Sequence, residues 1–408
     1  MGPLWQQCCR SARRGENGRV NRGSGVAGRD GWGGRDGWAG RGGAGGLGGV
    51  NLPGLRGHNE ALLLDLLRGA GPEGLDRAAL AARTGLTPQA VSKITARLAA
   101  EGLVAEAGRA ASTGGKPRTL LRLVRGARCA VGVQVDRDEL RAVRVDLAGG
   151  VLAESRGPLD FGAGPDAVVE AVVRACARVL DPVGPALLGV GVAAPGPLDV
   201  AAGVMGPVTG FPEWEGFPLR EVLEGRLGVP VRVDKDTNAG AAGAAGAVAA
   251  GAGAAGAFGA GGCAAYLHVG TGLGAGLWLG GGVYRGGRSA AGEFGHQVLQ
   301  LDGPECRCGR RGCVEVLCLA AVARGDLAGA ARVLGEGAAN LVALLDVDRV
   351  LLGGRVVEAA PEVFVDGVRG VLAARGPGSA PAVVALARVG VAEGAAELVM
   401  GPFFGRAG

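Results

Sequence analysis

The sequence predicts an α/β protein in which an N-terminal winged helix-turn-helix precedes a larger part with mixed sheets in two lobes. Residues 58–104 carry short helical patterns around a tight turn. From Cys129 onward, Val-rich strand patterns alternate with amphipathic helices. Charge is also divided, because residues 1–128 hold 20 Lys and Arg against 9 Asp and Glu, whereas the other 280 residues hold 23 against 29. This asymmetry favours a nucleic-acid-binding module followed by a ligand-binding or catalytic module.

These patterns divide the chain into three parts. We expect residues 1–54 to form a disordered Gly- and Arg-rich leader, residues 55–126 the winged helix, and residues 127–408 the α/β part. The leader contains the near-repeat "RDGWGGRDGWAGRGG" and has neither a helix period nor a strand period. It either adds nonspecific affinity for phosphates or is an extension without function.

Composition limits how the cores can pack and in which compartment the protein is expected. Aromatic residues make up only 4% and Gly numbers 82, so Ala, Val, Leu and Gly must pack the cores. Nine cysteines occur without a secretory signal ahead of them, and no apolar run reaches the 18–20 residues of a membrane span. We therefore expect a reduced, cytoplasmic protein without a membrane segment, whose cysteines are metal ligands or buried thiols.

The helix-turn-helix has recognisable helix ends. Asp76 is a plausible N-cap for the first short helix, and Gly85 is a plausible left-handed C-cap. Thr87 and Pro88 open the second helix, with a capping hydroxyl followed by proline at the first helical position. The predicted recognition helix covers residues 87–98, with apolar residues on its inner face: Val91, Ile94 and Leu98.

The outer face of this helix and the hairpin after it are candidates for contacting double-stranded DNA. Residues 102–124 predict a β-hairpin wing with its tip at 113–117. A three-helix core without a DNA partner would share the helical pattern, but the wing and the basic charge favour DNA binding. The candidate DNA-contacting residues are Thr87, Gln89, Ser92, Lys93, Arg97 and, in the wing, Lys116.

One stretch has the spacing of a metal site. In "GHQVLQLDGPECRCGRRGCVE", His296 precedes the C-x-C-x4-C run formed by Cys306, Cys308 and Cys313. Three thiolates and an imidazole suit tetrahedral zinc, and such closed four-ligand sites are usually structural. Glycines within the run allow the backbone to fold tightly enough to bring the sulfurs together. The alternative is three unrelated thiols near a surface turn.

From about residue 55 to 400, the chain resembles the ROK family of repressors, open reading frames and kinases. The most specific match is "AGEFGHQVLQLDGPECRCGRRGCVE", which is similar to the family's zinc and sugar signature. Further matches follow in the family's order: "GVAAPGPLD", "PEWEGFPL", "VDKDTNAG" and "VGTGLGAGLWLGGGVYRG", with "TGGKPRTLLRL" at the wing. The resemblance implies an actin-like, two-lobed sugar-kinase fold.

The resemblance also implies a ligand site. Asp236 matches the carboxylate that deprotonates the sugar hydroxyl in the kinases, and Glu293, His296 and Glu315 match residues that hydrogen-bond sugar hydroxyls. His296 is implied as a zinc ligand as well. Lys235 stands where the family usually has a sugar-binding Asn, so part of the sugar's hydrogen bonding is altered here.

Departures at the first phosphate loop separate two hypotheses. In "VGVQVDRDEL", Gln134 replaces the family's Asp and Asp136 replaces a Gly, which removes an acid that holds Mg²⁺ and adds a negative charge near a polyanion. We therefore expect no catalysis and a vestigial base at Asp236, in a sugar-responsive transcriptional regulator, most simply a repressor. The alternative is an ATP-dependent, glucokinase-like sugar kinase carrying a winged helix. The glycines of "GTGLGAG" favour that alternative weakly, since a Gly-rich strand-turn-strand explains them equally well.

The regulator hypothesis brings expected partners. A DNA operator and a sugar or sugar-derivative effector follow from the two modules. A homodimer or homotetramer follows from the need of winged helices to read an inverted repeat. The chain after Glu315 is also shorter than is usual in the family, which predicts that a helical piece of the second lobe is missing.

Overall fold

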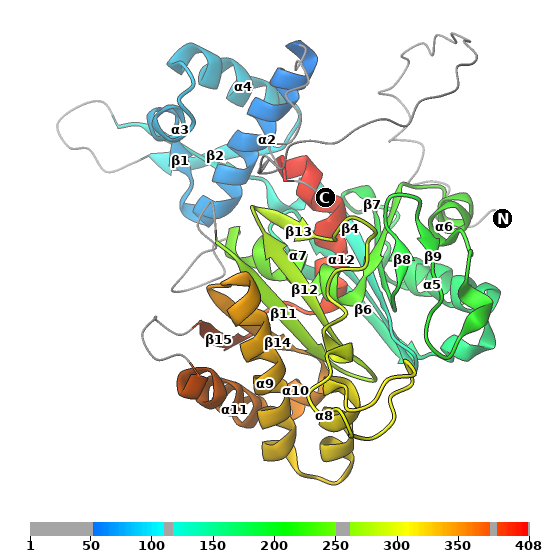
Figure 1. Ribbon diagram of the computed structural model, residues 1–408. Helices are drawn as coiled ribbons and strands as arrows, with labels where there is room; N and C mark the ends of the chain where they lie inside the picture. Colours follow the sequence, from blue (N-terminus) through cyan, green and yellow to red (C-terminus); the bar gives the residue numbers. More distant parts are fainter. Residues whose placement is uncertain (1–51, 110–116, 250–261, 376–381, 407–408) are drawn as a thin grey trace, which may run out of the picture.

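A computed structural model describes residues 52–109, 117–249, 262–375 and 382–406. Most of the predicted leader, the wing tip with Lys116, and part of the Gly/Ala tract lie outside these residues. The fold is a winged helix followed by a two-lobed α/β part, which confirms the predicted fold class (Figure 1).

The winged helix begins with α2 (Leu52–Ala70), followed by a short 3₁₀ turn (Gly71–Glu73). Then come β1 (Leu75–Asp76), α3 (Arg77–Thr84), α4 (Pro88–Ala100), β2 (Val104–Arg109) and β3 (Thr119–Leu123). The three strands pair in the order β1-β3-β2, and β2 and β3 form the antiparallel wing.

The predicted helix ends of the helix-turn-helix are confirmed. The Asp76 carboxylate accepts a hydrogen bond from the Ala79 amide at 2.7 Å, and Gly85 has the left-handed φ of 69°. Thr87 caps α4 with its hydroxyl, 3.2 Å from the Ala90 amide. The caps fix where each helix begins and ends, and so orient α4 against α3.

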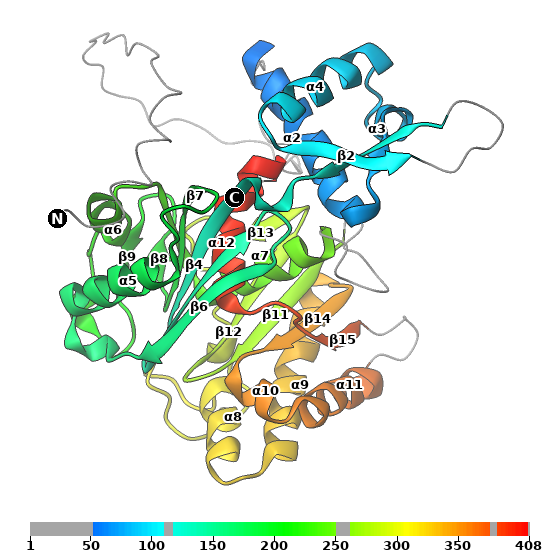
Figure 2. The same cartoon turned by 180° about the vertical axis from the view of Figure 1, so that it is seen from behind.

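The first lobe is built on a five-stranded sheet with the order β10-β7-β4-β5-β6. Its strands are β4 (Arg128–Val135), β5 (Glu139–Asp146), β6 (Val151–Pro158), β7 (Ala186–Ala194) and β10 (Val231–Lys235), with a 3₁₀ turn (Arg125–Ala127) ahead of β4. Helices α5 (Pro165–Val179) and α6 (Leu219–Leu227) cover the outer face (Figure 2). A 3₁₀ turn (Phe161–Ala163) precedes α5, and the ribbon of β8 (Leu198–Asp199) and β9 (Val204–Met205) and a second 3₁₀ turn (Pro212–Trp214) precede α6.

The second lobe has a five-stranded sheet with the order β13-β12-β11-β14-β15. Its strands are β11 (Ala264–Val269), β12 (Leu273–Leu279), β13 (Gly282–Tyr284), β14 (Arg349–Gly353) and β15 (Val383–Leu386). A 3₁₀ turn (Phe294–His296) precedes α8 (Val314–Ala323), α9 (Leu327–Leu345), α10 (Arg355–Ala359) and α11 (Pro361–Arg375). Residues of α8, α9 and α11 complete a closed apolar core with the sheet.

Two helices run between the sheets. They are α7 (Asp236–Ala249) and α12 (Val391–Met400), and α12 leads into the final 3₁₀ turn (Gly401–Phe404). The layer is thin because backbones touch. A Cβ on Gly191 would overlap the Ala395 carbonyl of α12, and one on Gly394 would overlap the Ala239 carbonyl of α7. This close packing explains how a chain with so much Gly and Ala fills its interior.

By length and composition, α9 is apolar enough to cross a membrane, and it is the one such helix among the described residues. Residues along α9, including Ala330, Leu334 and Ala338, are fully buried in the core of the second lobe. A core helix passes the same compositional test.

Candidate ligand cleft, metal cluster and DNA-facing helix

A cleft opens between the two lobes where five loops converge. The β4–β5 turn, the loop after β7, the junction of β10 with α7, the β11–β12 turn and the segment before α8 all supply its walls. All five residues predicted to contact a ligand line it: Lys235, Asp236, Glu293, His296 and Glu315. Residues 22 apart in sequence, Glu293 and Glu315, therefore face the same space.

Asp236 begins α7, and its carboxylate accepts the Thr237 amide at 2.6 Å. Burial raises the pKa of Asp236 above its usual range, and the charge of Asp136 across the cleft acts in the same direction. His268 and Lys235 oppose these effects. A carboxyl group with a raised pKa can donate a hydrogen bond to a ligand hydroxyl when it is protonated, and can accept one when it is ionised.

Lys235 is 3% exposed and points along the wall of the cleft. Its ammonium donates to the Ala291 carbonyl and to Glu293 Oε1, the latter at 3.2 Å. The ammonium therefore orients and partly neutralises the Glu293 carboxylate, so Lys235 changes the charge at two positions of the cleft rather than one.

Glu315 lies in the first turn of α8, and its Oε2 accepts the Leu273 amide at 3.0 Å. The bond ties α8 to the β11–β12 turn and holds the carboxylate at the cleft. A backbone amide orients a carboxylate without cancelling its charge.

His296 and the three cysteines form one cluster, and their ligand atoms all lie within 4.8 Å of one another. Cys306 Sγ is 3.7 Å from His296 Nδ1, and Cys308 Sγ is 3.7 Å from Cys313 Sγ. With zinc–sulfur bonds near 2.3 Å, thiolates at a tetrahedral ion lie about 3.8 Å apart. The donor set and its spacing therefore fit a tetrahedral metal ion.

The thiols differ in how readily they ionise, because burial is outweighed by hydrogen bonds that lower the pKa of Cys308, whereas the pKa of Cys313 is raised. Burial, together with the neighbouring Cys308 and Cys306 thiols, raises the pKa of Cys313 to about 12. Thiols that resist ionisation when crowded become thiolates when a cation binds among them. Gly309 and Gly312 take φ values of 83° and 63°, which give the loop the sharp turns that bring the sulfurs together.

A buried histidine of the cleft was not predicted from the sequence. His268, at the end of β11, is 7% exposed, and its Nδ1 lies 3.1 Å from the Tyr266 hydroxyl. It lines both the cleft and a second cavity between the lobes. The available signal was a histidine inside an otherwise apolar strand directly before a Gly-Thr-Gly turn.

The second cavity lies on the side of Gln134, and paired charges line it. Arg141 makes two hydrogen bonds to Glu393, at 2.6 and 2.7 Å, and Arg355 donates to Asp138 at 2.8 Å. Between the two cavities, the Thr271 hydroxyl donates to Asp136 Oδ1 at 2.5 Å. The Thr271 and Arg355 contacts both join the lobes directly.

On the winged helix, four predicted DNA-contacting residues are exposed along one face of α4 and its N-cap: Thr87, Gln89, Ser92 and Lys93. Arg97 is only partly exposed, because its guanidinium pairs with Glu60 of α2. Val91 and Leu98 are buried as predicted, and Ile94 is half-buried.

Comparison with known proteins gives two family matches. The profile of the ROK family matches residues 130–324, and that of the MarR family matches residues 54–111. The putative xylose repressor of Caldicellulosiruptor sp. strain Rt8B.4 is 27% identical over 59% of this chain, and the alignment spans 59% of that protein. The chain thus aligns with about three fifths of that relative's length.

Two solved structures share the fold. A ROK family transcriptional regulator, described as a homologue of the Escherichia coli MLC protein, superposes with a TM-score of 0.64 at 19% identity, over 86% of this chain and 97% of that one. The ROK hexokinase of Thermus thermophilus is 30% identical with a TM-score of 0.51, over 66% of this chain and 97% of that one. Taken with the cleft and the cysteine cluster, these matches establish that the chain belongs to the ROK family and carries a MarR-type winged helix ahead of its ROK domain.

Proposed function

We propose that this protein is a sugar-responsive, DNA-binding transcriptional regulator, acting as a repressor, whose kinase-like part senses a sugar or sugar derivative without phosphorylating it. The observation that carries the proposal is the direct contact between the two hairpin turns of the lobes. Thr271 donates to Asp136 where a kinase would need room and backbone amides for nucleotide phosphates.

The charges of the second cavity support the same conclusion. The three arginines that line this cavity are each occupied by carboxylates, since Arg141 pairs with Glu393, Arg156 with Glu139 and Arg355 with Asp138. A polyanion such as ATP would have to separate these pairs and approach Asp136 and Glu139. A second candidate function, sugar kinase, is favoured by the 30% identity to a ROK hexokinase and by the glycine turn at residues 270–276.

In the cleft, we assign ligand contacts to Lys235, Asp236, Glu293, His296 and Glu315. Carboxylates, an ammonium and an imidazole together provide the donors and acceptors that a polyol requires. We assign zinc to His296, Cys306, Cys308 and Cys313, where it would be structural. A metal on Nδ1 leaves the proton on Nε2 of His296, so that the cleft receives a donor in a fixed direction.

For DNA, we assign base contacts to Gln89, Ser92 and Lys93. We assign further DNA contacts to Thr87, Arg97 and the wing residue Lys116, the last at the minor groove or at a phosphate. We infer a dimer or tetramer in the cytoplasm that presents two recognition helices to an inverted repeat. We place the module boundary between residues 126 and 127, in the 3₁₀ turn that links β3 to β4.

The experiment that tests the function has two arms. Repeated selection from a random duplex pool should enrich an inverted repeat, and Lys93→Ala should weaken binding to the enriched duplex by about 5-fold or more. Sugars such as D-xylose, D-glucose and N-acetyl-D-glucosamine should then be screened for release of the duplex. No enriched sequence would contradict the regulator. Turnover of ATP with any of these sugars at about one per second would favour the kinase instead.

A further inference from the structure

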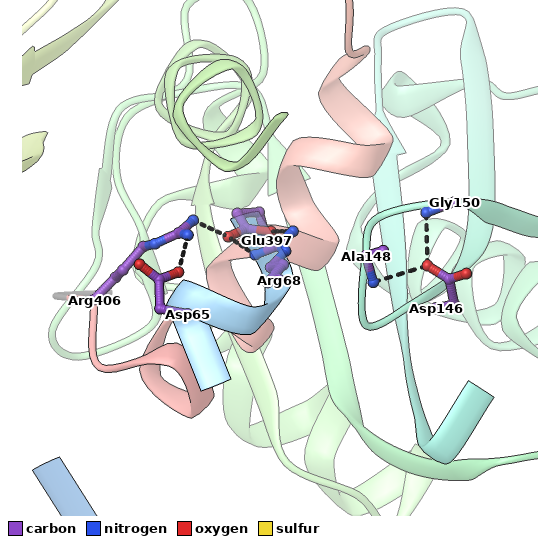
Figure 3. A network of polar contacts seen from close by, with 7 residues as sticks. All are labelled: Asp65, Arg68, Asp146, Ala148, Gly150, Glu397 and Arg406. Atoms are coloured by element: carbon purple, nitrogen blue, oxygen red, sulfur yellow. Dashed lines mark hydrogen bonds and ion pairs between the residues drawn. The ribbon is translucent and has the colours of Figure 1, made fainter. Parts of the chain in front are cut away.

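A buried group of charges joins the winged helix to the α/β part. Arg68, in the last turn of α2, makes two hydrogen bonds to Glu397 of α12, at 2.9 and 2.8 Å. The two side chains are only 1% and 7% exposed. Figure 3 shows the pair with Arg406, which donates to Glu397 Oε1 at 2.9 Å and also pairs with Asp65 of α2.

The contact between Arg68 and Glu397 fixes the orientation of the two helices as well as their distance. Taking charges out of water is costly, and the loss is recovered only when the pair has good geometry. The parallel two-point contact of a guanidinium with a carboxylate fixes an angle as well as a distance. The Arg68 guanidinium also lies over the Phe404 ring, 4.6 Å from its centroid. A rotation of α12 therefore either breaks this contact or turns the end of α2 with it.

Helix α12 is in turn held tightly to α7. A Cβ on Gly243 would come within 2.8 Å of the Gly394 Cα, so the two helix backbones are in contact at that point. One turn further on, a Cβ on Gly246 would lie 2.5 Å from Glu397 Cδ. Helices packed backbone to backbone have no flexible side chains between them to absorb a displacement.

The other end of α7 is in the ligand cleft, because the helix begins at Asp236. Ten residues of α helix separate Asp236 from Gly246, a span of about 15 Å. One helix thus reaches from the cleft to the carboxylate that holds the winged helix.

We propose that the Arg68–Glu397 pair is the positioning joint through which occupancy of the cleft sets the orientation of the winged helix. This inference rests on the proposed regulatory function. A ligand that draws in the start of α7 also shifts α12, and Glu397 then moves Arg68 with the end of α2. The shared apolar core of α2, α12 and the winged helix holds the two parts together, and the ion pair gives their contact its angle.

Allosteric coupling is reciprocal, so the joint can be tested from the DNA side without knowing the effector. Hydrogen–deuterium exchange is measured on the full zinc-loaded chain, with and without the duplex enriched from the random pool. In the wild type, we expect the duplex to change exchange in residues 237–246 by about 5-fold or more.

The variant Arg68→Met/Glu397→Met replaces the pair with apolar side chains of similar length in a surrounding that already holds Phe404. Such replacements often leave stability unchanged. The duplex should still protect residues 88–100 of this variant, but the change in residues 237–246 should disappear. The control Arg226→Met/Glu170→Met removes an ion pair between α6 and α5, away from α7, and should keep the wild-type response.

Should the double variant unfold in part, Gly246→Ala provides the same test from the α7 side, because its methyl group displaces the Glu397 carboxylate. A wild-type response in residues 237–246 of the folded joint variant, or of Gly246→Ala, overturns the proposal. So does an enriched duplex that binds the wild type and leaves α7 unchanged. Absence of any enriched duplex is a different outcome. It overturns the proposed regulatory function, and with it the role proposed for the Arg68–Glu397 pair.

Discussion

The two cavities between the lobes share the residues Asp136 and His268, yet they use their carboxylates in different ways. In the ligand cleft, backbone amides hold Asp236 and Glu315. In the second cavity, the arginines of the lining pair with carboxylates, as Arg141 does with Glu393 and Arg156 with Glu139. An amide orients a carboxylate and leaves its charge available to a ligand, whereas a guanidinium neutralises it.

Under the proposed function, this difference separates ligand binding from catalysis. Phosphoryl transfer needs one site for the acceptor and a second site for the nucleotide. A sensor needs only the first, and the second can then join the lobes. Lys235 is an intermediate case. It brings a cation into the cleft itself and donates to Oε1 of Glu293, which leaves Oε2 available to a ligand.

The largest effect should come from the metal cluster, which shapes the cleft. Cys308→Ser removes one of four ligands, so the wild type should carry about one zinc per chain and the variant close to none. The loops ending at Glu293 and Glu315 then lose their common anchor, and the melting temperature should fall by about 5–10 °C. Elemental analysis and calorimetry measure both quantities. Cys263→Ser, outside the cluster, is the control, and equal zinc in the two variants would contradict the assignment.

The next effect should be confined to ligand response. Glu293→Gln keeps the shape of the side chain but removes the charge that Lys235 and a ligand hydroxyl share. Zinc content and DNA affinity should stay at wild-type values, while the sugar concentration needed to release the duplex should rise about 10-fold or more. Glu362→Gln, on the exposed side of α11, is the matched control. An unchanged sugar response in Glu293→Gln would show that the cleft is not the sensor.

Much of the fold was readable because local signals and the global pattern agree. The caps at Asp76 and Thr87, the period of α4 and the Val-rich strands each depend on neighbours in sequence. The metal cluster was readable for the same reason, since three of its four ligands lie within eight residues.

The missed pairings all depend on distant partners. Arg97 has the spacing of an outward residue, but its pairing with Glu60 depends on how α2 crosses α4. The bond from Thr271 to Asp136 joins residues 135 apart, and that of Arg68 to Glu397 joins residues 329 apart. Sequence periodicity reports the face on which a residue lies and carries no information on which element packs against that face.

A smaller effect is expected when a sugar and Mg-ATP are compared for their effect on thermal stability, because each ligand would need a different cavity. A sugar that binds the cleft at about 100 times its dissociation constant should stabilise the protein by about 2.7 kcal/mol, visible as a rise in melting temperature. Mg-ATP at the same concentration should give no rise, because the arginines that line the second cavity, Arg141, Arg156 and Arg355, are already paired with carboxylates. A clear rise with Mg-ATP, enlarged by sugar, would break the comparison and favour the kinase.

The smallest effect should come from the outer edge of the second cavity. The side chains of Arg355 and Asp138 are 44% and 54% exposed, so solvent screens their pair. Arg355→Ala should lower the free energy of unfolding by about 0.2–1 kcal/mol, and less in 1 M NaCl. Arg141→Ala removes a two-point pair whose partners are 15% and 14% exposed, and leaves Glu393 without its partner. Its cost in urea unfolding should be larger and should persist in high salt, because buried pairs are screened less. Equal, salt-sensitive costs for the two variants would mean that the second cavity is an open, solvated surface, and the contrast with the ligand cleft would then fail.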